Sequence, residues 1–344
     1  MQSQRREFIK GFGAVGAFGA AALSMGACGG GNVGNNGSES GGEAASGGSS
    51  GSKDYLSGPY VDLSTGVGNK IAYARTQGNL DESVQKTGWF KGYVMGVRPG
   101  EAIRDLFGFA GFGVSRLQQN EDGSIAKILR EVGYYTDLRS GEVLEEWHNP
   151  YTDETVPVVP IANDPFNYVI SDYFPEPPRF GGLNEEVPPK IPFILPWQQR
   201  GPRIDMEIHI HLHYPNALDP AKWARESTGS MVQVSEFFAF HLDGAQLQNP
   251  DLTTLPYHGV WNRTTPWLPW MLMGQSPGFC QYAAFMGAGE DLEQVHDRAL
   301  LDYAEKHHPK YFNAPETYDP DEPSLSSLEW YAIERTPAPP KQET

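Results

Sequence analysis

The segment from Arg203 to Tyr214 constrains the fold most, because its side chains alternate strictly between polar and apolar. The polar set is Asp205, Glu207, His209, His211 and His213, and the apolar set is Met206, Ile208, Ile210, Leu212 and Tyr214. A period of two residues is that of a β-strand, whose successive side chains point to opposite faces. This segment is therefore predicted to be a strand with one apolar and one polar face.

The region before it indicates more strands of the same kind. Candidate strands are residues 89–97, 105–118, 125–137, 142–148 and 156–161, with turn sequences such as Asn120-Glu121-Asp122-Gly123 between them. Short turns between consecutive strands give antiparallel pairing. Further candidates are residues 230–242, which also suit a buried helix, 279–286 and 326–335. We expect a mainly β fold, a large antiparallel meander that forms a calycin-like barrel or a sandwich.

Two segments indicate helices. Residues 290–308 carry Leu292, Val295, Ala299 and Tyr303 at helical spacing with charges between them, which predicts an amphipathic helix packed on the sheet. Residues 215–226 predict a turn and a short helix. The stretch 175–202 holds eight of the 28 prolines and is predicted to be a surface connection or a lid without regular structure.

The first residues look like an export address. Arg5-Arg6 followed by an apolar run from Gly11 to Gly26 resembles a twin-arginine signal, and Ser24-Met25-Gly26-Ala27-Cys28 resembles a bacterial lipobox. By that resemblance Cys28 is lipidated, and the protein is anchored on the periplasmic side of the cell envelope. We expect a signal peptide over 1–27, a Gly/Ser-rich flexible tether over 28–53, a single domain over 54–336 and a tail over 337–344.

Charge and cysteine content limit the classes of partner and the disulfide bonds that we expect. The net charge is −17, which argues against a nucleic-acid partner because phosphate binding needs a basic face. The two cysteines are Cys28 and Cys280, so acylation of Cys28 would leave no intramolecular disulfide. The membrane, through Cys28, and a small molecule are the expected partners.

The stretch from Pro256 to Phe279 concentrates the chemistry of the chain. Its candidate ligand-binding residues are Trp261, Trp267, Trp270 and Met273. Arg263 and Asn262 precede the Trp-Pro segment, and an Arg beside aromatic faces can bind a carboxylate or phenolate. One interpretation is the floor of a pocket for a hydrophobic or aromatic molecule with an anionic or hydroxyl group. The other is a Trp-rich plug that seals the end of a barrel.

Two functions of different class remain open. One is a cofactor-independent lyase or isomerase, with His258 or Glu236 as base and Arg263 or Asn262 as anion stabiliser. Glu236 lies among phenylalanines, where a carboxylate has a raised pKa, although it can also point to water. The other function is a non-catalytic lipoprotein that binds a similar molecule.

A metal site is a minor alternative to the expectation that the protein uses no cofactor. His209, His211 and His213 lie on one strand face, and two histidines at i and i+2 can bind one ion. The competing interpretation is a solvated polar face, and no diagnostic spacing marks further ligands nearby.

Several motifs together resemble a known family. They are Val97-Arg98-Pro99-Gly100-Glu101, the run REVGYYTDLRSGEVLEEWHNPYTDETVPVVPIANDP from Arg130 to Pro165, RTTPWLPWMLMGQSPG from Arg263 to Gly278, and His308-Pro309 followed by Ala314-Pro315-Glu316. They resemble the bacterial domain-of-unknown-function family 1838 over roughly residues 70–335. The family has no assigned activity, so the resemblance implies no catalytic residues. The three-histidine strand is not part of its pattern.

Overall fold

The computed structural model of the chain describes residues 53–163, 166–175, 189–319 and 325–341. The predicted signal peptide, Cys28 and nearly all of the predicted tether lie outside these residues, as does the middle of the proline-rich stretch. No helix of the described part has the length and apolar character needed to cross a membrane.

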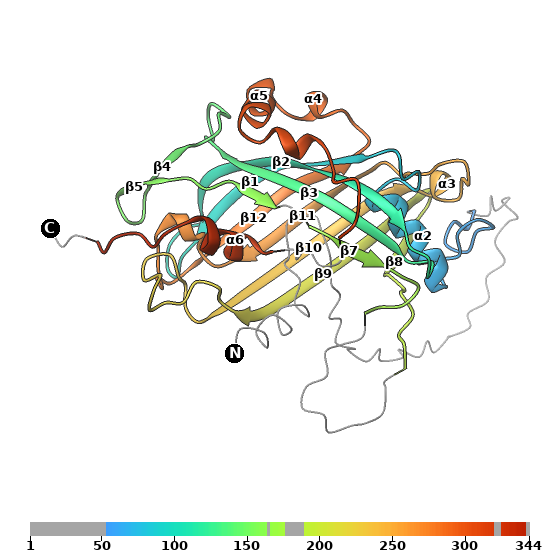
Figure 1. The fold of residues 1–344 in the computed structure, drawn as a ribbon, viewed down its shortest axis with the longest axis horizontal. Helices are drawn as coiled ribbons and strands as arrows, with labels where there is room; N and C mark the ends of the chain where they lie inside the picture. Colours follow the sequence, from blue (N-terminus) through green and yellow to red (C-terminus); the bar gives the residue numbers. More distant parts are fainter. Residues whose placement is uncertain (1–52, 164–165, 176–188, 320–324, 342–344) are drawn as a thin grey trace, which may run out of the picture.

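One large antiparallel sheet dominates the molecule (Figure 1). Its strands are β1 (Lys86–Val97), β2 (Arg104–Gln119), β3 (Ile125–Thr136), β6 (Ile161–Asn163), β7 (Tyr168–Ile170), β8 (Trp197–Arg200), β9 (Arg203–Pro215), β10 (Met231–Asp243), β11 (Tyr257–Thr265) and β12 (Phe279–Ala288). The order is β6-β3-β2-β1-β12-β11-β10-β9-β8, with β7 paired to β3. A separate two-stranded sheet pairs β4 (Glu146–Asn149) with β5 (Glu154–Pro157).

The prediction of a mainly β fold with a large antiparallel sheet is confirmed. The path of pairing runs from β6 to β8 without returning, so the described strands form an open sheet and not a closed barrel. The two meanders, β1–β3 and β8–β11, are joined by β12, which pairs with β1 on one side and β11 on the other. Residues far apart in the sequence thereby become neighbours on one surface.

The helices lie around this sheet. They are α2 (Gly66–Gln77), α3 (Gly244–Leu247), α4 (Leu292–Val295), α5 (Arg298–His307) and α6 (Ser327–Glu334), with 3-10 turns η1 (Pro269–Met271) and η2 (Pro309–Phe312). The amphipathic helix predicted over 290–308 is present but broken into α4 and α5. It packs on β2 and β3, as predicted, where Leu300, Leu301 and Ala304 contact a small core of their own.

Three local predictions were wrong. The strand predicted over 326–335 is the helix α6, which begins with a capping box: the Ser326 hydroxyl accepts a hydrogen bond from the Glu329 amide, and the Glu329 carboxylate accepts one from the Ser326 amide. The proline-rich stretch contains β8, an edge strand paired with β9. Residues 216–229 form turns in place of the predicted short helix. The helix α2 was not predicted, because its glycines and asparagine give a weak helical pattern.

The two faces of the sheet differ sharply. The inner face, defined here as the one that carries Phe90, Phe109, Trp261 and Tyr282, holds the main hydrophobic core. The outer face is covered by α5 and η2 over β2 and β3. On β9 the apolar residues face inward and the histidines outward, so the predicted alternation of this strand is confirmed.

Candidate functional site

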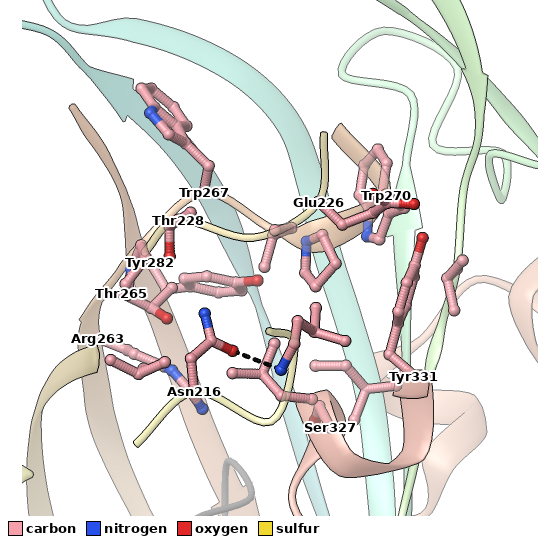
Figure 2. A pocket seen from close by; sticks show the side chains of 18 of the residues that line it. Asn216, Glu226, Thr228, Arg263, Thr265, Trp267, Trp270, Tyr282, Ser327 and Tyr331 are labelled. Atoms are coloured by element: carbon pink, nitrogen blue, oxygen red, sulfur yellow. Dashed lines mark hydrogen bonds between the residues drawn. The ribbon is translucent and has the colours of Figure 1, made fainter. Parts of the chain in front are cut away.

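A cavity of about 80 Å³ lies on the inner face of the sheet, between the strands and a cover of irregular chain (Figure 2). Its floor comes from β3, β9, β10, β11 and β12, through Tyr135, Tyr214, Val232, Trp261, Arg263, Thr265 and Tyr282. Its cover includes residues 159–161, the turn η1 and the helix α6, which contributes Ser327, Leu328 and Tyr331.

Strand register brings the polar groups of the floor together. Glu236 on β10 lies opposite Arg263 on β11, and Arg263 lies opposite Tyr282 on β12. Directly opposed residues on neighbouring strands share a face and are close enough to interact. The inner face of three adjacent strands therefore presents a carboxyl, a guanidinium and a phenol in a row.

Glu236 and Arg263 form a buried ion pair. Arg263 Nη1 lies 3.2 Å from Glu236 Oε1, and the Glu236 side chain is 0% exposed against 15% for Arg263. Trp261 Nε1–H donates to Glu236 Oε2 at 3.0 Å. Burial raises the pKa of Glu236, although Arg263 and Trp261 oppose the rise. Burial alone would lower the pKa of Arg263, but Glu236 and the nearby tyrosines outweigh it, so the guanidinium stays charged.

Two tyrosines complete this end of the cavity. The hydroxyls of Tyr135 and Tyr282 lie 3.0 Å apart and share a hydrogen bond. Burial raises the pKa of both phenols, so both remain neutral donors and acceptors at physiological pH. A third phenol, Tyr214, also has a pKa raised by burial and lines the same wall.

The opposite end of the cavity has a different polar group. Figure 2 shows Glu226 and Tyr331 on one side of the space and Arg263 with Thr265 on the other. The Glu226 side chain is buried, and its Oε1 accepts a hydrogen bond from the backbone N–H of Ala338. Its Oε2 is shielded from solvent and has no hydrogen-bond partner within the described chain.

The tryptophans of the Pro256–Phe279 stretch both fill the core and line the cavity. Trp261, Trp267 and Trp270 are buried in the main core and also form cavity wall. The ring of Trp270 packs against Phe107, Tyr135 and Trp147. Met273 is buried but does not line the cavity; its sulfur accepts a hydrogen bond from the Asn149 amide.

His258 and Asn262 lie on the other face of β11. They alternate with Trp261 and Arg263, so their side chains point outward, away from the cavity. The imidazole of His258 is 72% exposed and lies 3.1 Å from Glu290. Of the four residues considered for catalysis, only Arg263 lines the cavity; Glu236 is paired with it behind the wall, and the other two point away.

The three histidines of β9 also lie on the outer face. His211 Nδ1 is 3.1 Å from the Ser235 hydroxyl, and the ring of His209 packs on Phe237. Among residues 53–163, 166–175, 189–319 and 325–341 there is no group of three or more His, Cys, Asp or Glu side chains placed to hold a metal ion. On the same strand, Asp205 accepts hydrogen bonds from Arg203 and is 2.8 Å from His241 Nδ1.

Several cavity residues were not among the sequence candidates. Tyr282 is in step with the buried residues Cys280 and Ala284 of β12, whereas β3 is buried on both faces around Tyr135, and neither pattern distinguishes a cavity from solid core. Glu226 comes from a loop without periodicity, so no sequence signal identified it. Its position depends on the C-terminal segment that donates to it.

Comparison with known proteins identifies the family of the chain. A family model described as a protein of unknown function, DUF1838, matches residues 84–333, which contain the whole sheet and all but the last residue of α6. No curated protein matches the chain.

Proposed function

The chain belongs to the DUF1838 family, whose description assigns no activity, and we propose that its cavity binds a small hydrophobic or aromatic molecule with an anionic or hydroxyl group. The observation that carries the proposal is the placement of the Arg263 guanidinium in the wall of an otherwise aromatic cavity. The curved open sheet would act as a calycin-like cup for this ligand.

Arg263 suits this role because its charge is held in place. The pairing with Glu236 fixes one edge of the guanidinium, while 15% of the side chain remains exposed at the cavity. A planar guanidinium recognises a carboxylate through two parallel hydrogen bonds, and its N–H groups can also donate to the single oxygen of a phenolate. In a water-poor aromatic site such bonds are stronger than in water.

The volume limits the ligand to one ring or less. Water takes roughly 30 Å³ per molecule in the liquid, and an apolar cavity of about 150 Å³ binds benzene. A space of about 80 Å³ is smaller than that, so a ring-sized ligand requires the cover to move outward. The helix α6 can do so at low cost, because it has no buried residue.

A screen of small acids tests the proposal. Residues 53–344 would be titrated with aromatic and aliphatic carboxylates and with their uncharged amides, and binding would be measured by thermal shift and calorimetry. The acids are expected to bind at least tenfold more tightly than the amides. Arg263→Gln should remove that preference and Asn262→Ala, its neighbour on the outer face, should keep it. Equal affinity for acids and amides in the wild type would refute the proposal.

Acid–base catalysis on the bound molecule is the second candidate. The raised pKa of Glu236, caused mainly by its burial, supports this candidate. A general acid or base works best when its pKa lies near the ambient pH. Arg263 and the phenols of Tyr135 and Tyr282 would stabilise an anionic intermediate. Neither His258 nor Glu236 is among the residues that line the cavity in the described structure, but Glu236 lies directly behind Arg263, which does.

Proton exchange separates the two functions. Ligands found in the screen that carry a C–H bond next to the acid group would be incubated in D₂O with wild type and with Glu236→Gln, and exchange of that hydrogen would be followed by NMR. Exchange that depends on Glu236 supports catalysis. Binding without any exchange leaves a pure binding protein.

We also propose export and lipid anchoring, supported by the twin-arginine motif and by the lipobox that ends at Cys28. In a bacterial host, labelling with a radioactive fatty acid should mark the wild-type protein and not Cys28→Ser. Replacement of Arg5 and Arg6 by lysine should retain the precursor in the cytoplasm. Unchanged labelling of Cys28→Ser would contradict the anchor.

A further inference from the structure

The carboxylate of Glu226 is a cavity group whose chemistry the ligand proposed above leaves unused. The residue is 2% exposed, and its Oε2 has no hydrogen-bond partner in the described part of the chain. A buried acceptor without a donor costs free energy that folding must offset. An atom of this kind at the wall of a cavity is suited to a donor supplied from outside the chain.

The orientation of Glu226 is fixed by other contacts. Its Oε1 accepts a hydrogen bond from the backbone N–H of Ala338. The same C-terminal segment is held by Arg225, whose guanidinium donates to the Pro339 carbonyl and pairs with Glu154. Lys341 pairs with Glu154 as well, at 3.1 Å. One carboxylate oxygen is therefore anchored, and the other is buried without a partner in a residue that lines the cavity.

The cavity has a polar group at each of two ends, a hydrogen-bond donor at one and an acceptor at the other. At one end the Arg263 guanidinium lines the cavity and carries only donors, so a ligand group that contacts it is an acceptor. At the other end the free oxygen of Glu226, near Tyr331, requires a donor (Figure 2). Between them the walls are aromatic, formed by Trp261 and Trp270 among others.

We propose that the ligand carries an acidic group bound by Arg263 and, at its far end, a hydroxyl or amino group that donates to Glu226 Oε2. This inference rests on the proposed function and narrows it from any small acid to hydroxy- or amino-substituted acids of about one ring. Glu226 then determines specificity, because an acid without the far donor leaves the buried carboxylate unsatisfied.

Three probes of similar size test the far end. They are benzoate, 4-aminobenzoate, which adds a donor, and 4-nitrobenzoate, which adds acceptors only. Calorimetry on wild-type residues 53–344 is expected to show 4-aminobenzoate binding about tenfold or more tightly than benzoate, the gain of one hydrogen bond to a charged acceptor. The nitro compound should bind more weakly than benzoate, because its oxygens face the carboxylate.

Glu226→Gln should reverse this order. Its amide oxygen can still accept from Ala338, so its NH₂ group takes the place of Oε2 and presents a donor. The variant is then expected to prefer 4-nitrobenzoate over 4-aminobenzoate. Glu154→Gln is the matched control, since it removes the same charge and loosens the same C-terminal segment but leaves Glu226 intact. It should keep the wild-type order.

The outcomes separate this inference from the function on which it rests. If all three acids bind the wild type with equal affinity, and Glu226→Gln changes none of them, the role of Glu226 is refuted and the acid-binding cavity stands. If no acid binds the wild type at all, both are refuted. The wild-type order of the three probes is decisive by itself if Glu226→Gln fails to fold.

Discussion

The inner and outer faces of β9, β10 and β11 carry similar residue types but in opposite environments. On the outer face, His209, His211 and His258 are exposed and contact neighbours such as Phe237, Ser235 and Glu290. On the inner face, Glu236 and Arg263 are withdrawn from water and paired with each other. Titratable side chains on the same strand thus differ in exposure and in pairing because they point to different faces of the sheet. How closely such residues follow one another in the sequence does not determine this difference.

The same contrast appears in the pKa values of two carboxyl groups. Burial raises the pKa of Glu236 on the inner face. Burial alone would raise that of Asp205 on the outer face too, but the hydrogen bonds from His241 and Arg203 outweigh it and lower the pKa. Both carboxyl groups are buried, but cationic and hydrogen-bonding neighbours favour the ionised form of Asp205, whereas the site of Glu236 favours protonation.

The largest expected effect is on the inner face. Arg263→Met would leave Glu236 buried without its cation, and we expect a loss of about 3–5 kcal/mol in the free energy of unfolding at pH 7, the usual cost of breaking a buried ion pair. Urea denaturation measures it. The loss should shrink as the pH falls and Glu236 is protonated. A loss below about 1 kcal/mol would mean that the pair is effectively solvated, like those of the outer face.

The pH dependence of stability should have opposite signs at the two carboxyl groups. The pKa of Glu236 in the folded protein is above 4.5. Its contribution to the free energy of unfolding is therefore fully present below the pKa of the unfolded chain and is lost as the pH rises through the pKa of the folded protein. The folded pKa of Asp205 is below 3.8, so its contribution is present above that value and is lost as the pH falls. Urea denaturation from pH 3 to 7 is the measurement. In the Glu236→Gln variant, the free energy of unfolding should no longer fall as the pH rises above about 4.5. In the Asp205→Asn variant, it should no longer fall as the pH is lowered into the acidic range.

Substitutions of outer-face residues next to the ion pair should have small effects. His258→Ala and Asn262→Ala are expected to change stability by no more than about 0.5 kcal/mol, as surface substitutions do. They should also leave the affinity for a bound acid unchanged, which calorimetry would show. A tenfold loss of affinity in either variant would contradict the assignment of the site to the inner face.

The smallest effect on stability is expected when the three histidines of β9 are replaced. We predict that protein purified without chelator contains well under one equivalent of zinc, iron or copper by elemental analysis. Replacement of His209, His211 and His213 together by alanine should leave the melting temperature within about 2 °C. One equivalent of metal that disappears in the triple variant would restore the metal site as the functional centre.

Much of the sheet was predictable, because strand alternation is local. The pattern of 203–214 gave both the strand and its two faces, and the family motifs agreed with the match found over residues 84–333. Glu236 and Arg263 were identified as candidates from their aromatic neighbours. Their pairing was not, because the register of β10 against β11 depends on a connection of 13 residues whose shape the sequence does not give.

The sequence by itself determined the β class, the acidic surface and the residues that can carry charge beside the tryptophans. Only the tertiary structure decided which of them share a site. The insertion of β12 between β1 and β11 brings Tyr282 beside Arg263, and the C-terminal segment fixes Glu226 across the cavity from it. Both arrangements are long-range contacts, in which burial and hydrogen bonding between distant segments outweigh any local preference of the chain.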